Sequence, residues 1–254
     1  MFTKEKVIDG VVQRDFIVEV NGETVPCVIY ANEGAEGKRP LILMGHGGSQ
    51  HKKTDSLRSR AVQWARRKNW ATLAIDAPDH GDRISREQAA RFMEEVGKRV
   101  SGEVRTPLDG ARMKQMGKRA EKALPEWKAA LDMALGFEFI AGTDRIGYWG
   151  VSMGTVIGVP LVANEPRVRC AVFGLAGLGA GATQMKDAAA KITIPVEYVF
   201  QWEDAVASRE SGIDLFNAFA SKEKTMHINP GGHMDIPRFE GESWLRFFER
   251  HLEN

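Results

Sequence analysis

Three residue types that together perform nucleophilic catalysis occur in an ordered series: Ser152, then an acid at position 203 or 204, then His233. Ser152 lies within Gly150-Val151-Ser152-Met153-Gly154. A serine hydroxyl is a weak nucleophile that needs a base to take its proton, and the base needs an acid to orient it. The sequence therefore holds the groups for attack of a serine oxygen on a carbonyl carbon.

Sterics explain why glycine stands two residues before and two residues after Ser152. An apolar, β-rich run at 145–149 precedes the pentapeptide and a helical pattern at 155–159 follows it, which predicts a strand, a sharp turn and a helix. A strained turn at the serine brings the flanking chain close together, and only glycine, which lacks a Cβ atom, fits on both sides. Because the pattern alone also fits an ordinary glycine-rich connection, the surrounding groups must decide.

The elements that would position these groups predict a mostly parallel sheet covered by helices on both faces, since strand and helix patterns alternate. Val11 to Val20 and Thr24 to Ala31 flank Asn21-Gly22, a strong hairpin signal, and predict an antiparallel N-terminal edge. Further strands are predicted at 40–44, 70–75, 145–149, 168–175, 194–201 and 224–229, and helices at 55–68, 119–137, 155–159, 208–220 and 241–252.

In such sheets, functional groups gather in loops at the carboxyl ends of the parallel strands. The loops that contain His46, Ser152, position 203 or 204, and His233 all follow predicted strands. His233 is the best-placed base, because His227 lies inside a predicted strand and His251 lies on the last helix.

Taken jointly, these motifs make the chain similar to the α/β-hydrolase family, and most similar to small serine esterases related to the dienelactone-hydrolase-like group. The resemblance covers Val11 to His251 and rests on residues 41–47, 76–81, 150–154, 201–204 and 231–233. It implies an α/β-hydrolase fold and hydrolysis of carboxylic esters through an acyl-enzyme on Ser152, with no cofactor and no metal. Dienelactone hydrolases themselves have a cysteine nucleophile, so the serine favours simple ester hydrolysis. A peptidase, thioesterase or acyltransferase is the alternative on the same machinery.

The resemblance also selects the acid of the triad. The residues alone leave Glu203 and Asp204 open, whereas the family pattern of a loop aspartate followed by a valine such as Val206 favours Asp204. The implied catalytic triad is therefore Ser152, His233 and Asp204. By position alone, Trp202 and Leu178 are expected to line the substrate pocket.

The oxyanion that forms on the attacked carbonyl needs N–H donors. The backbone N–H of Met153, directly after the nucleophile, is one donor. By the family pattern Gly48 supplies the second, with Gly47 and Ser49 as alternatives. His46 is then expected to hold this loop in place rather than to act as a base.

Composition is that of an ordinary globular protein: 254 residues, of which 43% are hydrophobic and 27% are charged. We expect one domain over residues 1–254, with a lid-like insertion at about 83–118, where the pattern becomes charged and is punctuated by glycine. Helical pieces but no strand are expected there, and an ordinary surface excursion with amphipathic helices is the alternative for that segment. A net charge of +1 does not favour nucleic acid or an anionic membrane as partner, so a small-molecule ester is expected.

The N-terminal residues, the lengths of the apolar runs and the two cysteines predict where the protein is located and the redox state of its thiols. The charged first residues lack the apolar core of a signal peptide, and no run approaches the ~20 apolar residues of a membrane span, so a cytoplasmic protein is expected. Cys27 and Cys170 lie in apolar strand-like runs and are expected to be buried thiols. The sequence leaves the oligomeric state open.

Two other patterns and one other class were weighed. Asp76, Asp79, His80 and Asp82 could hold a metal, but they lack clear ligand spacing. Gly177 to Ala182 loosely fits a dinucleotide-binding pattern, yet the candidate ribose-binding acid, Glu197, falls inside the next predicted strand. A nicotinamide oxidoreductase is therefore less favoured than a hydrolase, and the complete series of serine, acid and histidine argues against a non-catalytic binding module that keeps only the fold.

Overall fold

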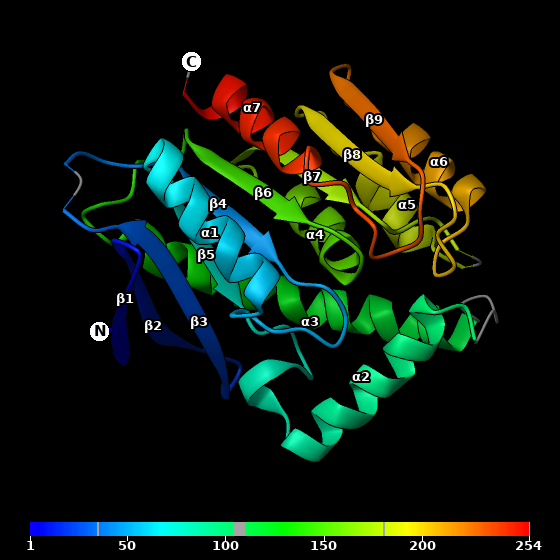
Figure 1. Cartoon of the computed structure of the whole chain (residues 1–254), viewed down its shortest axis with the longest axis horizontal. Helices are drawn as coiled ribbons and strands as arrows, with labels where there is room; N and C mark the ends of the chain where they lie inside the picture. The colour runs from blue at the N-terminus through cyan, green and yellow to red at the C-terminus, as the bar shows by residue number, and fades with distance from the viewer. Residues whose placement is uncertain (35, 104–109, 180, 254) are drawn as a thin grey trace.

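One sheet of nine strands runs through the protein (Figure 1), whose computed structural model describes residues 1–34, 36–103, 110–179 and 181–253. The strand order is β1-β2-β3-β5-β4-β6-β7-β8-β9. The pairs from β1 to β5 are antiparallel and those from β5 to β9 are parallel, which confirms the predicted sheet and its N-terminal edge. The strands are β1 Lys4–Ile8, β2 Val11–Val20, β3 Glu23–Asn32, β4 Leu41–Gly45, β5 Ala71–Ile75, β6 Ile146–Gly150, β7 Val168–Gly174, β8 Val196–Gln201 and β9 Lys224–Asn229.

Helices cover both faces of this sheet. The helices are α1 Asp55–Lys68, η1 Gly81–Arg83 (a 3₁₀ turn), α2 Arg86–Val100, α3 Gly110–Leu135, α4 Met153–Ala163, α5 Thr183–Ala189, α6 Arg209–Ala218 and α7 Glu240–Leu252. Buried side chains of α1 and α7 pack on one face, and those of α3 to α6 pack on the other. No helix in the described part of the chain is both long and apolar enough to cross a membrane.

The predicted insertion at 83–118 is mostly helical. It contains α2 and the first turns of α3, while its residues 104–109 lie outside the described residues. No side chain of α2 is fully buried, and the helix lies to one side of the two layers that sandwich the sheet (Figure 1). Segment 83–118 therefore supplies a helix held loosely against the body of the protein.

Two elements were not predicted, and one begins earlier than expected. The edge strand β1 is exposed and carries Lys4, Glu5 and Lys6, so it shows no apolar alternation. Charged residues on an edge strand are a common protection against pairing with another chain. The helix α5 follows the glycine- and alanine-rich loop and is short, and α3 starts at Gly110 rather than at 119.

The core is aromatic on both sides of the sheet and contains both cysteines. Phe173 on β7 stacks on Phe219 with ring centroids 5.5 Å apart, and Trp64 on α1 meets Phe248 on α7 edge to face. Cys27 and Cys170 are buried as predicted. Burial raises the pKa of the Cys27 thiol to about 12 and raises that of Cys170 as well.

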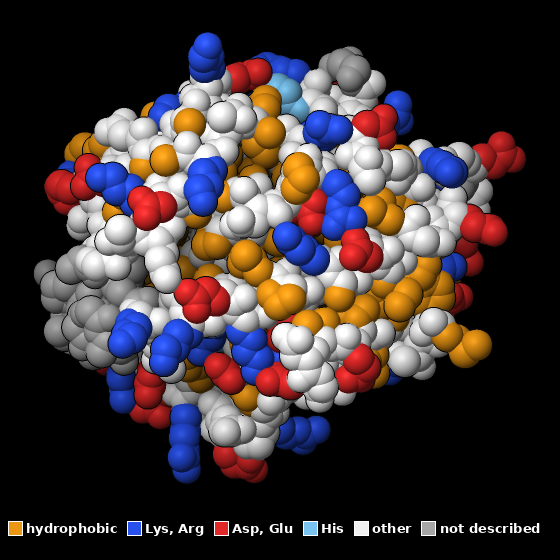
Figure 2. Space-filling view, turned by 180° about the vertical axis from the view of Figure 1, so that it is seen from behind, with side chains coloured by type: hydrophobic (Ala, Val, Ile, Leu, Met, Phe, Trp, Pro, Cys, Tyr) orange, Lys and Arg blue, Asp and Glu red, His pale blue; other side chains and the backbone are white. Residues whose placement is uncertain are grey.

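The surface carries no strong excess of one charge on the face seen in Figure 2. Lysine and arginine side chains are interspersed there with aspartate, glutamate and scattered apolar groups. This mixture is consistent with the near-balanced composition of the whole chain.

We predict that Phe173→Ala lowers the free energy of unfolding by about 3–5 kcal/mol, because the change removes a fully buried ring and leaves a cavity. Met133→Ala, at a position of α3 that is 40% exposed, is the control and should change it by less than about 0.5 kcal/mol. Urea unfolding followed by circular dichroism measures both. Equal costs at the two positions would contradict the assignment of Phe173 to the core.

Candidate functional site

Ser152 occupies a strained turn between β6 and α4. Its backbone has φ 57° and ψ −121°, a conformation that non-glycine residues rarely adopt. A Cβ atom on Gly154 would lie 2.5 Å from the carbonyl oxygen of Gly45, and one on Gly150 would lie 2.9 Å from the Gly154 backbone. The predicted steric reason is therefore confirmed for Gly150, whereas Gly154 lacks space for a side chain because the end of β4 lies against it.

Hydrogen bonds to neighbouring elements fix this turn. The Ser152 N–H donates to the carbonyl oxygen of Gly174, at the end of β7, over 2.8 Å. The hydroxyl of Thr155 lies 2.6 Å from the same carbonyl oxygen and accepts from the Gly174 N–H at 2.8 Å. The buried hydroxyl of Tyr148 donates to the carbonyl oxygen of Gly154 over 2.6 Å. The strained serine is thus held by bonds to β6 and β7.

Ser152, His233 and Asp204 form one hydrogen-bonded series. The Nε2 atom of His233 lies 3.0 Å from the Ser152 Oγ, and its Nδ1 atom lies 2.8 Å from the Asp204 Oδ2. The other carboxylate oxygen of Asp204 accepts from the backbone N–H groups of Val206 and Ala207. The side chains of His233 and Asp204 are 5% and 0% exposed. With Nδ1 protonated toward the carboxylate, Nε2 is free to accept the serine proton.

Glu203 has a different partner from its neighbour. Its carboxylate accepts from the backbone N–H of Gly231, in the loop that leads to His233, and its side chain is exposed to solvent. The structure therefore brings Asp204, and not Glu203, to the imidazole of His233.

The predicted oxyanion donors are the N–H groups of Met153, at the start of α4, and of Gly48, in the loop after β4. The N–H of Gly47 donates to the side-chain oxygen of Gln50 over 3.1 Å, so this alternative donor is occupied. Among the described residues, no hydrogen-bond acceptor is found for the N–H groups of Gly48 and Met153. Met153 opens helix α4, where the first N–H groups have no partner within the helix.

His46 holds the Gly48 loop. Its Nε2 accepts from the backbone N–H of Ala77 at 3.0 Å, and its Nδ1 lies 2.8 Å from the carbonyl oxygen of Gly47. Burial, and secondly the nearby His80, lowers the pKa of His46 to about 4. A neutral imidazole can accept from Ala77 and donate to Gly47 at the same time, as this geometry requires.

Two acids of the candidate metal cluster, Asp76 and Asp82, form ion pairs with a lysine instead. The buried ammonium group of Lys52 lies 2.6 Å from Asp76 Oδ2 and 2.5 Å from Asp82 Oδ2. His80 Nδ1 lies 2.8 Å from the carbonyl oxygen of Pro78. This ion pair ties the loop after β4 to the loop after β5, which is a structural task.

The residues expected to line a pocket are less clearly placed. Trp202 is 49% exposed, with the Arg209 guanidinium 4.3 Å from its ring centre. Leu178 donates its N–H to the carbonyl oxygen of Ser211 on α6, so the loop 177–182 packs against that helix. Residue 180 of that loop lies outside the described residues. A pocket role for Trp202 and Leu178 stays a prediction.

Sequence reasoning missed the side chains that lie over the loop containing Gly48. A Cβ atom built on Gly48 would lie 3.8 Å from Val96 of α2. One turn earlier on the same helix, the Phe92 ring meets the His80 ring edge to face, with centroids 5.0 Å apart. The mixed apolar and charged pattern of 83–118 indicated helical pieces, but no local signal shows which loop they cover.

Comparison with solved structures identifies esterases. No family model matches the chain, and no curated protein sequence matches it. A PEG-bound cold-adapted esterase from an Arctic intertidal metagenomic library is 32% identical over 98% of both chains, with a TM-score of 0.77. A zinc-bound cold-adapted esterase from such a library is 29% identical over 99% of both chains, with a TM-score of 0.72. Acetyl xylan esterase from Paenibacillus sp. R4 shares the fold, at 16% identity over 99% of this chain and 88% of the other, with a TM-score of 0.70.

The buried imidazole of His46 should make stability depend on pH. Its pKa of about 4 in the folded protein lies below the ~6.5 of an exposed histidine, so between these values the unfolded chain binds more protons. We predict that His46 reduces the free energy of unfolding by up to about 1.4 kcal/mol for each pH unit as the pH falls through this window. Urea unfolding at pH 7 and pH 5 should show a smaller difference for His46→Gln than for the wild type. A ring resonance of His46 that titrates near 6.5 in NMR spectra would refute the prediction.

Proposed function

Since this chain belongs to the α/β-hydrolase family of esterases, we propose that Ser152, His233 and Asp204 form the catalytic triad with which it hydrolyses carboxylic esters. The observation that carries the proposal is the hydrogen-bonded series from Asp204 through His233 to Ser152. The three residues lie in loops after β8, after β9 and after β6. The strained backbone of Ser152 adds support, because such strain is typical of functional positions.

In the first half of the reaction, Ser152 Oγ attacks the ester carbonyl while His233 Nε2 takes its proton. The carboxylate of Asp204 keeps the Nδ1 proton of His233 in place and stabilises the imidazolium that forms. The tetrahedral intermediate collapses when the imidazolium returns the proton to the leaving alcohol. The acyl group then remains on Ser152 as an ester.

In the second half, a water molecule replaces the alcohol. His233 Nε2 takes a proton from this water, whose oxygen attacks the acyl carbonyl. The second intermediate collapses with return of that proton to Ser152 Oγ, and the free acid leaves. No step needs an electron carrier or a further reactant.

We assign the oxyanion hole to the backbone N–H groups of Met153 and Gly48. Both groups lack an acceptor among the described residues, whereas Gly47 donates to Gln50. Backbone donors that are fixed before the reaction stabilise the negative charge that develops on the carbonyl oxygen. The bonds of His46 to Ala77 and Gly47 hold the second donor's loop.

Within a single domain built on one sheet, α2 is the proposed lid over this site. It has no fully buried side chain, and it contacts the body through Phe92 at His80 and Val96 at the Gly48 loop. Val96 faces the Gly48 loop, which supplies a donor to the reacting carbonyl in the proposed mechanism, and Phe92 lies one turn earlier on the same helix. Val96 is therefore suited to touch the acyl chain of a bound ester.

The triad assignment predicts different effects of two neighbouring substitutions. Asp204→Asn should lower kcat by about 10⁴-fold, because the amide favours the wrong tautomer of His233. Glu203→Gln, the matched control, keeps an oxygen that can accept from Gly231 and should retain most of the turnover. Hydrolysis of p-nitrophenyl esters from acetate to decanoate measures both, beside Ser152→Ala, which should be nearly inactive. A large loss with Glu203→Gln and a small one with Asp204→Asn would mean that the acid is Glu203.

The same assay, extended to p-nitroanilides and thioesters, separates the alternatives of peptidase and thioesterase. Labelling of wild type but not of Ser152→Ala by an organophosphonate would support the nucleophile independently of the leaving group. Activity that survives Ser152→Ala would remove the proposal.

The lid predicts a change in chain-length preference. Val96→Trp should lower kcat/KM for decanoate relative to acetate by about tenfold or more, since the larger ring narrows the space beside Gly48. Met93→Trp, on the same helix at a position that is 58% exposed, should leave the ratio unchanged. An unchanged ratio with Val96→Trp would show that α2 does not bound the acyl site.

A further inference from the structure

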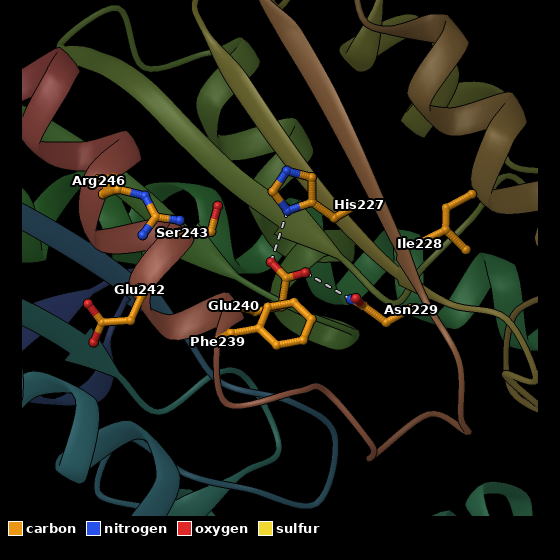
Figure 3. A pocket seen from close by; sticks show the side chains of 8 residues that line it. All are labelled: His227, Ile228, Asn229, Phe239, Glu240, Glu242, Ser243 and Arg246. Atoms are coloured by element: carbon orange, nitrogen blue, oxygen red, sulfur yellow. Dashed lines mark hydrogen bonds and ion pairs between the residues drawn. The ribbon is translucent and has the colours of Figure 1, made fainter.

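A second cluster of titratable side chains, made of residues outside the triad, lies where β8, β9 and the start of α7 meet, and Figure 3 shows two of its members, His227 and Glu240. Glu197, His227 and Glu240 come together there beside a hollow of ≈ 480 Å³. We propose that these three residues bind a divalent transition-metal ion. The proposed hydrolysis uses none of them.

The distances suit one small cation. One ligand atom from each residue lies within 4.8 Å of the other two. His227 Nδ1 lies 2.9 Å from Glu240 Oε2 and 3.9 Å from Glu197 Oε1. Tetrahedral coordination with bonds of ~2.0–2.1 Å separates ligand atoms by about 3.3 Å. Side-chain rotations that move the ligand atoms by about 1–1.5 Å would therefore complete a three-residue site, with a water as the fourth ligand.

One ligand atom is buried without a partner. Glu197 is 5% exposed, and among the described residues its Oε1 has no hydrogen-bond partner. Glu197 and Val199 are two places apart on β8, so their side chains lie on the same face of the sheet. The parallel register pairs Val199 with His227 on β9, which puts Glu197 on the face of His227. An unpartnered buried carboxylate oxygen is costly, and a cation beside it removes that cost.

The charges also balance. Glu240 is 1% exposed, so two carboxylates are buried against one imidazole. A protonated His227 and the guanidinium of Arg246, which lines the same hollow, are the cations of the protein beside these carboxylates, whereas a divalent ion bound to neutral His227 brings two positive charges directly to the carboxylate oxygens. One nitrogen and two carboxylate oxygens form a ligand set that zinc and similar transition metals accept.

A second layer of hydrogen bonds orients Glu240. Asn229 Nδ2 donates to Glu240 Oε1 over 2.9 Å, which leaves Oε2 toward His227 (Figure 3). Asn229 Nδ2 also lies 3.4 Å from Gln201 Oε1, and Gln201 Nε2 donates to the carbonyl oxygen of Asp235. Such outer partners are typical of metal sites and fix the direction of the ligand atoms.

An ion at this position would affect the loop that carries His233. His227 directly precedes the segment 228–239, Glu240 directly follows it, and His233 lies within it. An ion bound to both residues joins the end of β9 to the start of α7 and so restrains the loop that carries the base. This consequence rests on the proposed role of His233, whereas binding of the ion does not.

Co²⁺ and Zn²⁺ are the probes for the test, added to full-length protein that has been treated with a chelator and then dialysed. The wild type should bind one equivalent saturably, with the strong visible absorption of four-coordinate Co²⁺ and its displacement by Zn²⁺. Glu197→Gln and His227→Gln should lose this binding. Glu242→Gln, a carboxylate beside the same hollow that pairs with Arg67, is the matched control and should keep it.

Two further variants locate the ion and separate this inference from the proposed function. His233→Gln should bind Co²⁺ like the wild type, because its imidazole belongs to the triad. Ser152→Ala should also bind normally although it hydrolyses no ester. Loss of binding in His233→Gln, together with normal binding in His227→Gln, would place the metal at the triad and overturn the inference.

Thermal unfolding shows whether a variant that does not bind the metal is still folded. At a hundredfold excess over Kd, Zn²⁺ should raise the Tm of the wild type and of Glu242→Gln by roughly 5–10 °C, and that of Glu197→Gln by none. Glu197→Gln keeps the shape of the side chain, and its metal-free circular dichroism should match the wild type. No saturable binding by folded wild type, or equal Tm shifts in all variants, would show that the cluster is only an ion pair.

Discussion

The contact between Gly154 and the carbonyl oxygen of Gly45 is the constraint on which the site depends. A Cβ atom at position 154 would lie 2.5 Å from that oxygen, so the start of α4 can approach the end of β4 only because no side chain intervenes. This approach places the Gly48 loop beside the nucleophile. The hydroxyl of Tyr148 occupies the same junction and leaves no space for a larger residue at Gly158, where a Cβ atom would lie 2.2 Å from its ring.

Most of the sheet could be predicted because its signals are local. Buried parallel strands such as β4 and β5 are short apolar runs, and Asn21-Gly22 marks the hairpin with two residues of positive φ. The strand β1 escaped prediction since its exposed charges hide the alternation, and within the described residues it pairs with β2 alone. The start of α3 at Gly110 was missed because glycine and charge in that stretch resemble a loop.

The arrangement of the candidate site could be predicted where chain order and sterics suffice, and could not be predicted from the residues alone where it depends on one position or on distant elements. The residues alone leave the adjacent acids at 203 and 204 equivalent, and only the family resemblance selected Asp204. In the structure the Glu203 carboxylate accepts from Gly231, and that of Asp204 accepts from Val206 and Ala207 beside His233. The cluster of Glu197, His227 and Glu240 draws on three separate elements. No spacing along the chain reveals it, because only the parallel register of β8 with β9 and the entry of α7 bring it together.

Covalent labelling of a thiol requires an exposed and deprotonated sulfur, and neither thiol of this chain has one. Cys27 and Cys170 are both 0% exposed, and burial holds their sulfurs in the unreactive protonated form. A maleimide dye therefore has no native site on the folded protein, although the chain is not free of cysteine. A single cysteine introduced on the exposed side of α2 would carry such a dye alone, and the movement of that helix could be followed by fluorescence without first removing either native thiol.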